Sequence, residues 1–147
     1  NLFKKLSKLE EYNEILVEKY IPGREIQAAV LGKFKLGAIE LVPRRKFYDY
    51  KAKYFKNANT RHLMPAPLSE KNYKKVIDIA FKAHKLLKCR GVSRSDFRFY
   101  KNKFYLLELN TQPGMTSMSL VPEIAKFRKI SFFKLLDLLI KDASYNK

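Results

Sequence analysis

Apolar residues recur at helical spacing in several stretches of the chain. The clearest stretch follows Ser69, a residue type that commonly caps a helix, and Gly91 is expected to end this helix. The same spacing predicts a short helix over residues 117–126 and an amphipathic helix from Ser131 through Asp142. Residues 2–12 have the pattern of the end of a further amphipathic helix.

Other stretches are rich in β-branched and aromatic residues or alternate between apolar and polar side chains, and these predict strands. They are Ile15–Ile21, Glu25–Leu31, Lys35–Pro43, His62–Pro65, Val92–Tyr100 and Phe104–Leu109. Turn signals at Pro22-Gly23 and Gly32-Lys33 join the first three into an antiparallel meander, and residues 47–60 are expected to form a long surface loop. Strands and helices in this mixed, mostly antiparallel order predict an α+β fold.

The composition is that of one globular domain. The chain has 147 residues, of which 46% are hydrophobic, and this is enough to bury a core. No apolar run approaches the roughly 20 residues of a membrane-spanning helix, so no membrane is expected among the partners. A single cysteine, Cys89, cannot form an internal disulfide and favours a reducing compartment. A cytoplasmic location is therefore expected.

The net charge of +17 predicts attraction to polyanions, which include nucleic acid, phosphorylated small molecules and acidic membrane surfaces. Because the lysines are spread through almost every segment, a solvated basic surface is favoured over a dedicated polyanion site. Residues 44–56 nevertheless combine aromatic side chains with lysines and arginines, as nucleic-acid surfaces do. A nucleic-acid-binding module therefore stays open as an alternative.

Two adjacent predicted strands provide opposed carboxylates. If Lys101–Lys103 form the turn, the facing pairs are Tyr100 with Phe104, Arg98 with Leu106, Asp96 with Glu108 and Arg94 with Asn110. Carboxylates directly opposite each other repel, so they need a positive charge, and a magnesium ion with Asn110 as a further oxygen ligand fits this need. The alternatives are that Arg94 or Arg98 pairs with the acids, or that the register slips by one residue.

The segment after the hairpin has features of an anion site. Pro113-Gly114 predicts a turn whose backbone N–H groups can hold a developing oxyanion. Thr116, Ser117 and Ser119 then precede a predicted helix, where N–H groups and the helix dipole favour a carboxylate or a phosphate. Ordinary N-capping by these hydroxyls is the alternative explanation.

Four separated segments resemble the C-terminal region of the bacterial D-alanine:D-alanine ligases of the ATP-grasp superfamily. They are Val17–Glu25, Phe47–Tyr54, Gly91–Phe97 and Leu106–Pro122, in the family's order over nearly the whole chain. The resemblance implies an ATP-grasp C-terminal catalytic domain in residues 23–147, with a lid over residues 44–60. Residues 1–22 would be the end of the central ATP-binding subdomain and its hinge. The N-terminal and central domains would be missing partners, and this piece would be inactive alone.

The resemblance implies ATP-dependent ligation of two D-alanines through an acyl phosphate, for peptidoglycan precursor synthesis. It assigns two Mg²⁺ or Mn²⁺ ions to Asp96, Glu108 and Asn110. Glu18 and Lys19 would meet the adenine of ATP, and Glu25 would receive the ribose hydroxyls. The full-length enzyme would be a homodimer, with ATP and D-alanine as partners in place of nucleic acid. Because Glu-x-Asn occurs across ATP-grasp enzymes, another carboxylate–amine ligase of the superfamily is the alternative.

The resemblance also assigns residues of the lid. Lys53 would contact the transferred phosphoryl group, while Tyr48 and Tyr54 would help to close the site. Relatives that make a D-alanyl-D-lactate ester commonly have histidine where this chain has Tyr54, so the tyrosine favours the dipeptide. Lys51 departs from the family pattern, because many relatives have an acid there.

The last implied residues surround the reacting carbonyl. Arg94 and the backbone N–H of Gly114 would hold the tetrahedral oxyanion. Ser119 and the backbone of Leu120 would hold the carboxylate of the second D-alanine. Met118 has no expected role toward substrate.

Overall fold

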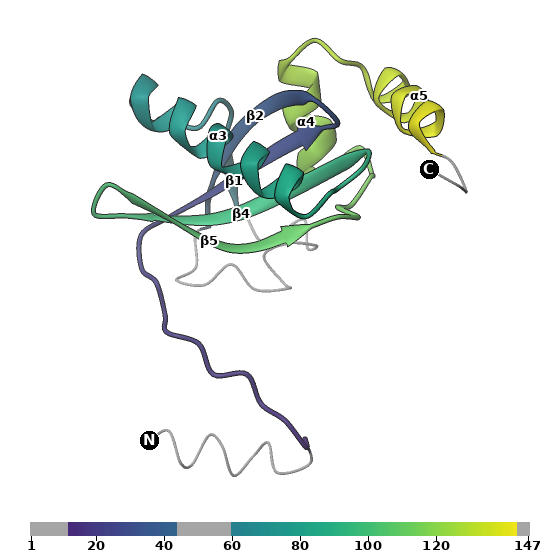
Figure 1. Cartoon of the computed structure of the whole chain (residues 1–147). Helices are drawn as coiled ribbons and strands as arrows, with labels where there is room; N and C mark the ends of the chain where they lie inside the picture. The colour runs from purple at the N-terminus through teal and green to yellow at the C-terminus, as the bar shows by residue number, and fades with distance from the viewer. Residues whose placement is uncertain (1–11, 44–59, 144–147) are drawn as a thin grey trace.

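Five strands form one antiparallel sheet in the order β3-β2-β1-β4-β5 in the computed structural model (Figure 1). The structure describes residues 12–43 and 60–143. The strands are β1 (Arg24–Leu31), β2 (Phe34–Val42), β3 (Arg61–Leu63), β4 (Val92–Tyr100) and β5 (Lys103–Asn110). The helices are α3 (Glu70–Leu86), α4 (Leu120–Phe127) and α5 (Phe132–Asp142). The predicted α+β fold is confirmed.

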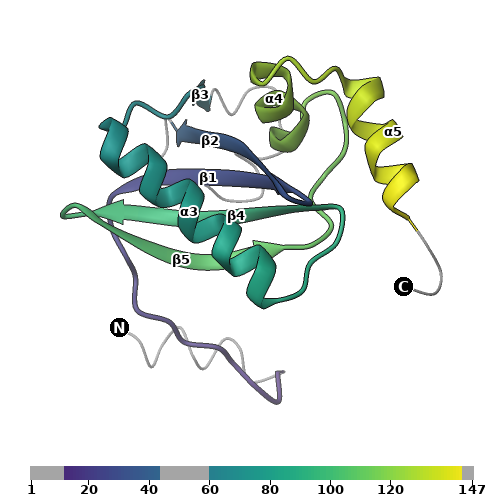
Figure 2. The same ribbon diagram turned by 45° about the horizontal axis from the view of Figure 1, so that its top comes forward.

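The sheet has a hydrophobic cluster on each face, because side chains alternate between the faces along each strand. On one face Ile26, Ala28 and Phe97 pack with Val76 and Ala80 of α3. On the other face α4 and α5 supply the cover, through residues that include Val121, Ile124 and Leu135. Figure 2 shows α3 crossing the sheet, with α4 and α5 lying to the side of β2. The layers are therefore helix, sheet and helix, with the second helical layer incomplete.

Local capping explains two of the helices. The Ser69 hydroxyl accepts a hydrogen bond from the Asn72 backbone N–H, and the Ser131 hydroxyl accepts one from the Lys134 N–H. Each bond satisfies one of the N–H groups that a helix start leaves without a partner. Both predicted caps are confirmed. The shorter helix, α4, begins at Leu120, three residues later than predicted.

The end of α3 differs from the prediction. Lys88, with φ +50°, takes the left-handed conformation that was expected of Gly91. The Cys89 N–H donates to the His84 carbonyl and the Lys88 N–H donates to the Lys85 carbonyl, both at 3.0 Å, which is the bonding of a Schellman motif. Gly91 instead precedes β4, and its N–H donates to the Asp142 carboxylate at 3.0 Å.

The strand predicted over Ile15–Ile21 is wrong. These residues form an extended segment without strand pairing, which leads into β1 and lies apart from the sheet (Figure 1). Leu16 is 83% exposed and Val17 is 65% exposed. A strand needs a hydrogen-bonded neighbour, and the described part of the chain places none beside this segment. The helix predicted over residues 2–12 and most of the loop predicted over residues 47–60 lie outside the described residues.

The glycine at the start of β1 offers a test of the fold. Gly23 has φ +109°, and an added Cβ would lie 2.3 Å from the Phe99 carbonyl oxygen. Gly32 has φ +53° but nothing within 4 Å of an added Cβ. We expect Gly23→Ala to lower the free energy of unfolding by about 2–5 kcal/mol, through strain and steric clash. Gly32→Ala is the control and should lose only about 1–2 kcal/mol. Thermal unfolding of both variants measures the difference, and equal losses would contradict this account.

Candidate functional site

The β4–β5 hairpin has a different turn from the predicted one. Lys101 and Asn102 form a two-residue turn with φ values of +46° and +60°, as a type I′ hairpin turn requires. Tyr100 therefore faces Lys103 and Arg98 faces Tyr105, so the predicted partners Phe104 and Leu106 are each wrong by one residue.

A bulge restores the register further along the hairpin. The pairing shifts between Asp96 and Phe97, which leaves Leu107 without a partner on β4. Beyond the bulge Asp96 faces Glu108, and Arg94 faces Asn110. Both of these predicted pairs are confirmed.

Polar side chains form three rows across β1, β4 and β5. The rows are Ala29–Arg94–Asn110, Gln27–Asp96–Glu108 and Glu25–Arg98–Tyr105. They lie on the face opposite α3, because the intervening residues Ala28 and Phe97 belong to the α3 cluster. On this face α4 packs over β2, so the polar rows begin where the helical cover ends. The sheet thus brings together Arg94, Asp96, Glu108 and Asn110, as the hairpin pairing predicted, and places Glu25 in the same rows.

An ion pair occupies the centre of these rows. The Arg94 guanidinium donates two hydrogen bonds to the Asp96 carboxylate, at 2.8 Å from Nε and 3.0 Å from Nη2. Asn110 Nδ2 donates to Glu108 Oε1 at 3.0 Å. The alternative in which Arg94 pairs with an acid is therefore observed. Two carboxylates that face each other on one side of a sheet still favour a positive charge beside them.

Burial disfavours the charged form of Asp96. Burial raises the pKa of the Asp96 carboxyl, and the neighbouring Glu108 carboxylate raises it further. The hydrogen bonds and positive charge of Arg94 lower this pKa but do not cancel the rise. A carboxyl perturbed by burial and a like charge is a common feature of functional sites.

The donor set fits a hard cation such as magnesium, which prefers carboxylate and amide oxygens. The described residues include no cluster of three or more His, Cys, Asp or Glu side chains suited to a metal. An ion here would therefore depend on Asp96, Glu108 and the amide oxygen of Asn110, with its other ligands from water or substrate.

Of the described residues assigned to ATP, the structure places only Glu25 in the polar rows. The Glu25 carboxylate lies 3.4 Å from Arg98 Nη2 and 3.4 Å from Gln27 Nε2, so it belongs to the polar rows. Glu18 and Lys19 lie in the extended segment before β1, which the structure does not bring to the rows (Figure 1). Tyr48, Lys53 and Tyr54 lie outside the described residues.

The segment between β5 and α4 is folded by Ser119. Its hydroxyl accepts a hydrogen bond from the Thr116 N–H at 3.0 Å and lies 2.9 Å from the Thr116 hydroxyl. It makes no side-chain cap on α4, although Ser119 is the N-cap residue. An added Cβ on Gly114 would lie 3.0 Å from this hydroxyl, so Gly114 and Ser119 are neighbours. The backbone of Leu120 follows at the start of α4.

The turn predicted at Pro113-Gly114 is wrong. The chain bends at residues 111–112 and turns at residues 117–118, and Gly114 has no left-handed φ. Gly114 has no side chain, and this lets the Ser119 hydroxyl lie close to it. The sequence alone does not show that these two residues are in contact.

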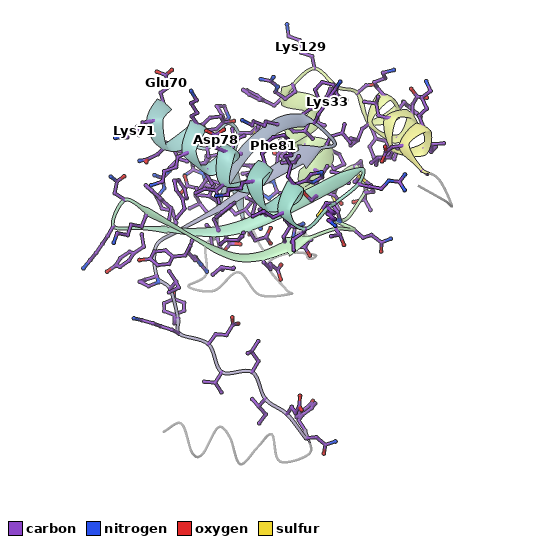
Figure 3. The ribbon with its side chains drawn as sticks, viewed as in Figure 1. Lys33, Glu70, Lys71, Asp78, Phe81 and Lys129 are labelled. Atoms are coloured by element: carbon purple, nitrogen blue, oxygen red, sulfur yellow. The ribbon has the colours of Figure 1, made fainter. Side chains whose placement is uncertain are left out.

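A cavity of about 420 Å³ lies at the C-terminal end of α3, apart from the predicted site. Its lining includes Lys33, Phe81, Lys85, Lys88 and Arg90; Lys33 and Phe81 are labelled in Figure 3. None of the predicted site residues lines it. The cavity therefore does not coincide with the carboxylates of β4 and β5.

Antiparallel strands that pair two acids on one face of the sheet are consistent with the ATP-grasp class. The model of the family "D-ala D-ala ligase C-terminus" matches residues 2–141. The chain therefore belongs to the C-terminal domain family of the D-alanine–D-alanine ligases.

The relatives agree with this family. The chain is 60% identical over 147 residues to the D-alanine–D-alanine ligase of Pelagibacter ubique, covering all of this chain and 48% of the relative. The D-alanine–D-alanine ligase of Bacillus anthracis, solved in complex with ATP, superposes with a TM-score of 0.79 at 32% identity, covering 96% of this chain and 46% of that one.

A D-Ala:D-Ser ligase from Enterococcus faecalis has a TM-score of 0.70 at 32% identity, covering 84% of this chain and 37% of that one. The chain thus spans about half the length of the curated relatives it matches. No helix in the described part of the chain is long and apolar enough to cross a bilayer.

The raised pKa of Asp96 predicts how the stability of the fold depends on pH. Because burial raises this pKa above its ordinary value of 3.8, the folded state favours the protonated carboxyl. The stability that this group contributes is present at low pH and is lost as pH rises from about 3.8 through the folded pKa. We therefore expect Asp96→Asn to raise the melting temperature of the full-length enzyme at pH 7, with a difference that shrinks toward pH 4.

Asp137→Asn is the control for this experiment. Hydrogen bonds from Lys141 and Lys134 lower the pKa of Asp137, so its removal should not raise the melting temperature at pH 7. A lower melting temperature for Asp96→Asn at pH 7 would show that the Arg94–Asp96 ion pair outweighs the effect of burial.

Proposed function

We propose that this chain supplies the metal-binding wall of an ATP-dependent D-alanine–D-alanine ligase, which joins two D-alanines for peptidoglycan precursors. The observation that supports it best is the direct pairing of Asp96 with Glu108, beside Asn110, on one face of the sheet. Membership of the family and the names of its relatives supply the reaction. The proposed enzyme acts in the cytoplasm.

The proposed reaction has two steps. The γ-phosphoryl group of ATP passes to the carboxylate of one D-alanine, which releases ADP and forms an acyl phosphate. The amine of the second D-alanine then attacks the acyl carbon, and phosphate leaves as the peptide bond forms. Asp96, Glu108 and Asn110 would hold Mg²⁺ or Mn²⁺ ions, which supply charge neutralisation to the phosphates when bound.

Arg94 is suited to stabilise the oxyanion of the second step. Its side chain is 6% exposed, and two hydrogen bonds to Asp96 fix the orientation of the guanidinium. A charged donor fixed before the reaction stabilises the tetrahedral oxyanion without reorganisation. The Gly114 backbone N–H would be the second donor to this oxyanion, as the resemblance to the family implies.

The second D-alanine would be held at the start of α4. Its carboxylate would accept hydrogen bonds from the Ser119 hydroxyl and the Leu120 N–H, where the helix dipole favours an anion. Ser119 already lies beside Gly114, so both groups approach one substrate region. Its hydroxyl bonds to Thr116 in the structure, and would rotate to donate to the substrate.

ATP would be held by residues from three parts of the chain. Glu18 and Lys19 form the hinge at the adenine, Glu25 receives the ribose hydroxyls, and Lys53 contacts the transferred phosphoryl group. In this proposal residues 1–22 end the central ATP-binding subdomain and residues 23–147 form the catalytic domain.

The lid, residues 44–60, would include Tyr48 and Tyr54. An acyl phosphate hydrolyses readily, so closure of the lid would protect it from water. The N-terminal and central domains would be the further partners of this chain, in an enzyme that is a homodimer.

Replacing Glu108 tests the metal-binding role. In the full-length enzyme, Glu108→Gln should lower D-alanine-dependent phosphate release by more than about 100-fold, since it removes a charged ligand. Glu70→Gln is the matched control, because Glu70 lies at the start of α3 on the other face of the sheet (Figure 3). Unchanged phosphate release by Glu108→Gln would refute the assignment of Glu108 as a metal ligand. Phosphate release with D-serine or D-lactate as the second substrate tests whether the enzyme prefers D-alanine.

Replacing Lys53 tests the lid. If Lys53 contacts the phosphoryl group mainly in the transition state, Lys53→Ala should lower kcat by about 100-fold or more with little change in the KM for ATP. Steady-state kinetics of the full-length enzyme measure both constants. A rise in KM equal to the whole loss in kcat/KM would instead show a ground-state phosphate contact.

A further inference from the structure

Gln27 is a buried polar residue to which the proposed function gives no role. It is 1% exposed and lies on β1 directly beside Asp96, in the row that continues to Glu108. Its neighbours along β1, Ile26 and Ala28, point to the α3 face. The Gln27 side chain therefore shares the face of the two carboxylates.

The amide of Gln27 is only half satisfied. Its Nε2 donates a long hydrogen bond of 3.4 Å to Glu25 Oε1, and this contact sets the orientation of the amide, because the flipped amide would place two oxygens together. Its Oε1 is buried and has no hydrogen-bond partner among the described residues. A buried oxygen without a donor is costly, so native proteins seldom keep one without a reason.

The location of this oxygen suggests the reason. Side chains that face each other on neighbouring strands have Cβ atoms roughly 5 Å apart, so the Gln27 carbonyl lies within reach of groups held by Asp96. Magnesium usually keeps several waters when it binds to protein carboxylates, and each such water is a hydrogen-bond donor. An ion between Asp96 and Glu108 would bring the missing donor to Gln27.

We propose that Gln27 is a positioning residue of the cation site, and that its Oε1 accepts a hydrogen bond from a water on the divalent ion held by Asp96 and Glu108. This inference rests on the proposed function. It adds a fourth oxygen-bearing side chain to Asp96, Glu108 and Asn110, and it explains why a polar side chain is buried at this point of β1. Residues that orient bound groups in this way typically change metal affinity by about 10–100-fold.

Manganese binding to the full-length enzyme tests the inference without measuring turnover. Electron paramagnetic resonance measures the dissociation constant of Mn²⁺ in the presence of a non-hydrolysable ATP analogue. Gln27→Met keeps the length of the side chain and removes its oxygen, and we expect it to raise the dissociation constant by about 10-fold. Gln27→Glu keeps the acceptor and should bind Mn²⁺ at least as tightly as the wild type, which keeps the test valid if the methionine variant folds poorly.

Ser95→Ala is a matched control. The Ser95 hydroxyl is also buried without a partner among the described residues, next to Asp96 in sequence but on the opposite face. Both Ser95→Ala and Gln27→Met remove an unsatisfied oxygen. Gln27→Met also removes the long hydrogen bond to Glu25, so we expect it to lower the melting temperature of the metal-free enzyme only slightly and Ser95→Ala not to lower it. Only Gln27→Met should weaken Mn²⁺ binding.

The outcomes separate the two proposals. Wild-type Mn²⁺ affinity in Gln27→Met, with affinity lost in Glu108→Gln, would overturn the role of Gln27 and leave the metal site intact. Equal weakening by Gln27→Met and Ser95→Ala would also overturn it, since the effect would then be a general change in the sheet. Wild-type affinity in Glu108→Gln would refute the metal site and this inference together.

Discussion

The bulge between β4 and β5 is the constraint on which the candidate site depends. The two-residue turn alone would place Asp96 opposite Leu107 and Glu108 opposite Ser95, on opposite faces of the sheet. The unpaired residue Leu107 moves Glu108 onto the face of Asp96. Without this irregularity the Glu108 carboxylate would point toward α3 and its apolar cluster. One extra residue therefore brings the two acids together.

That arrangement opposes the stability of the sheet. Two acids face each other, Asp96 is disfavoured by burial, and Gln27 keeps an oxygen without a donor among the described residues. The apolar clusters on both faces of the sheet offset this cost, since their central residues are fully buried. Arg94 pairs with Asp96. In the proposed site a bound cation would lie near both acids, so the groups that weaken the metal-free fold would favour the ligand.

The sequence predicted the elements with strong local signals. The helices α3 and α5 follow from their apolar period and the caps Ser69 and Ser131. It predicted the pairing of Asp96 with Glu108 through two errors that cancel, because a three-residue turn gives the same offset as a two-residue turn followed by a bulge.

What the sequence could not supply were features set by tertiary contact. The run Ile15–Ile21 has strand composition but no neighbour among the described residues with which to pair. Lys88 takes a left-handed conformation that glycine would favour, and only the bonds at the end of α3 reveal it. The position of Gln27 beside Asp96 was also not predicted. Its alternation with Ile26 and Ala28 indicates a strand, but the sequence does not show which residues of the neighbouring strand face it.

The candidate site divides its tasks between rigid and irregular parts of the chain. Gln27, Asp96 and Glu108 come from three strands whose spacing the sheet fixes, and a fixed spacing suits the proposed cation site. Gly114 and Ser119 come from the segment between β5 and α4, which local hydrogen bonds fold. A D-Ala:D-Ser ligase from Enterococcus faecalis has a similar fold, with a TM-score of 0.70. The likeness of fold therefore does not by itself identify a substrate.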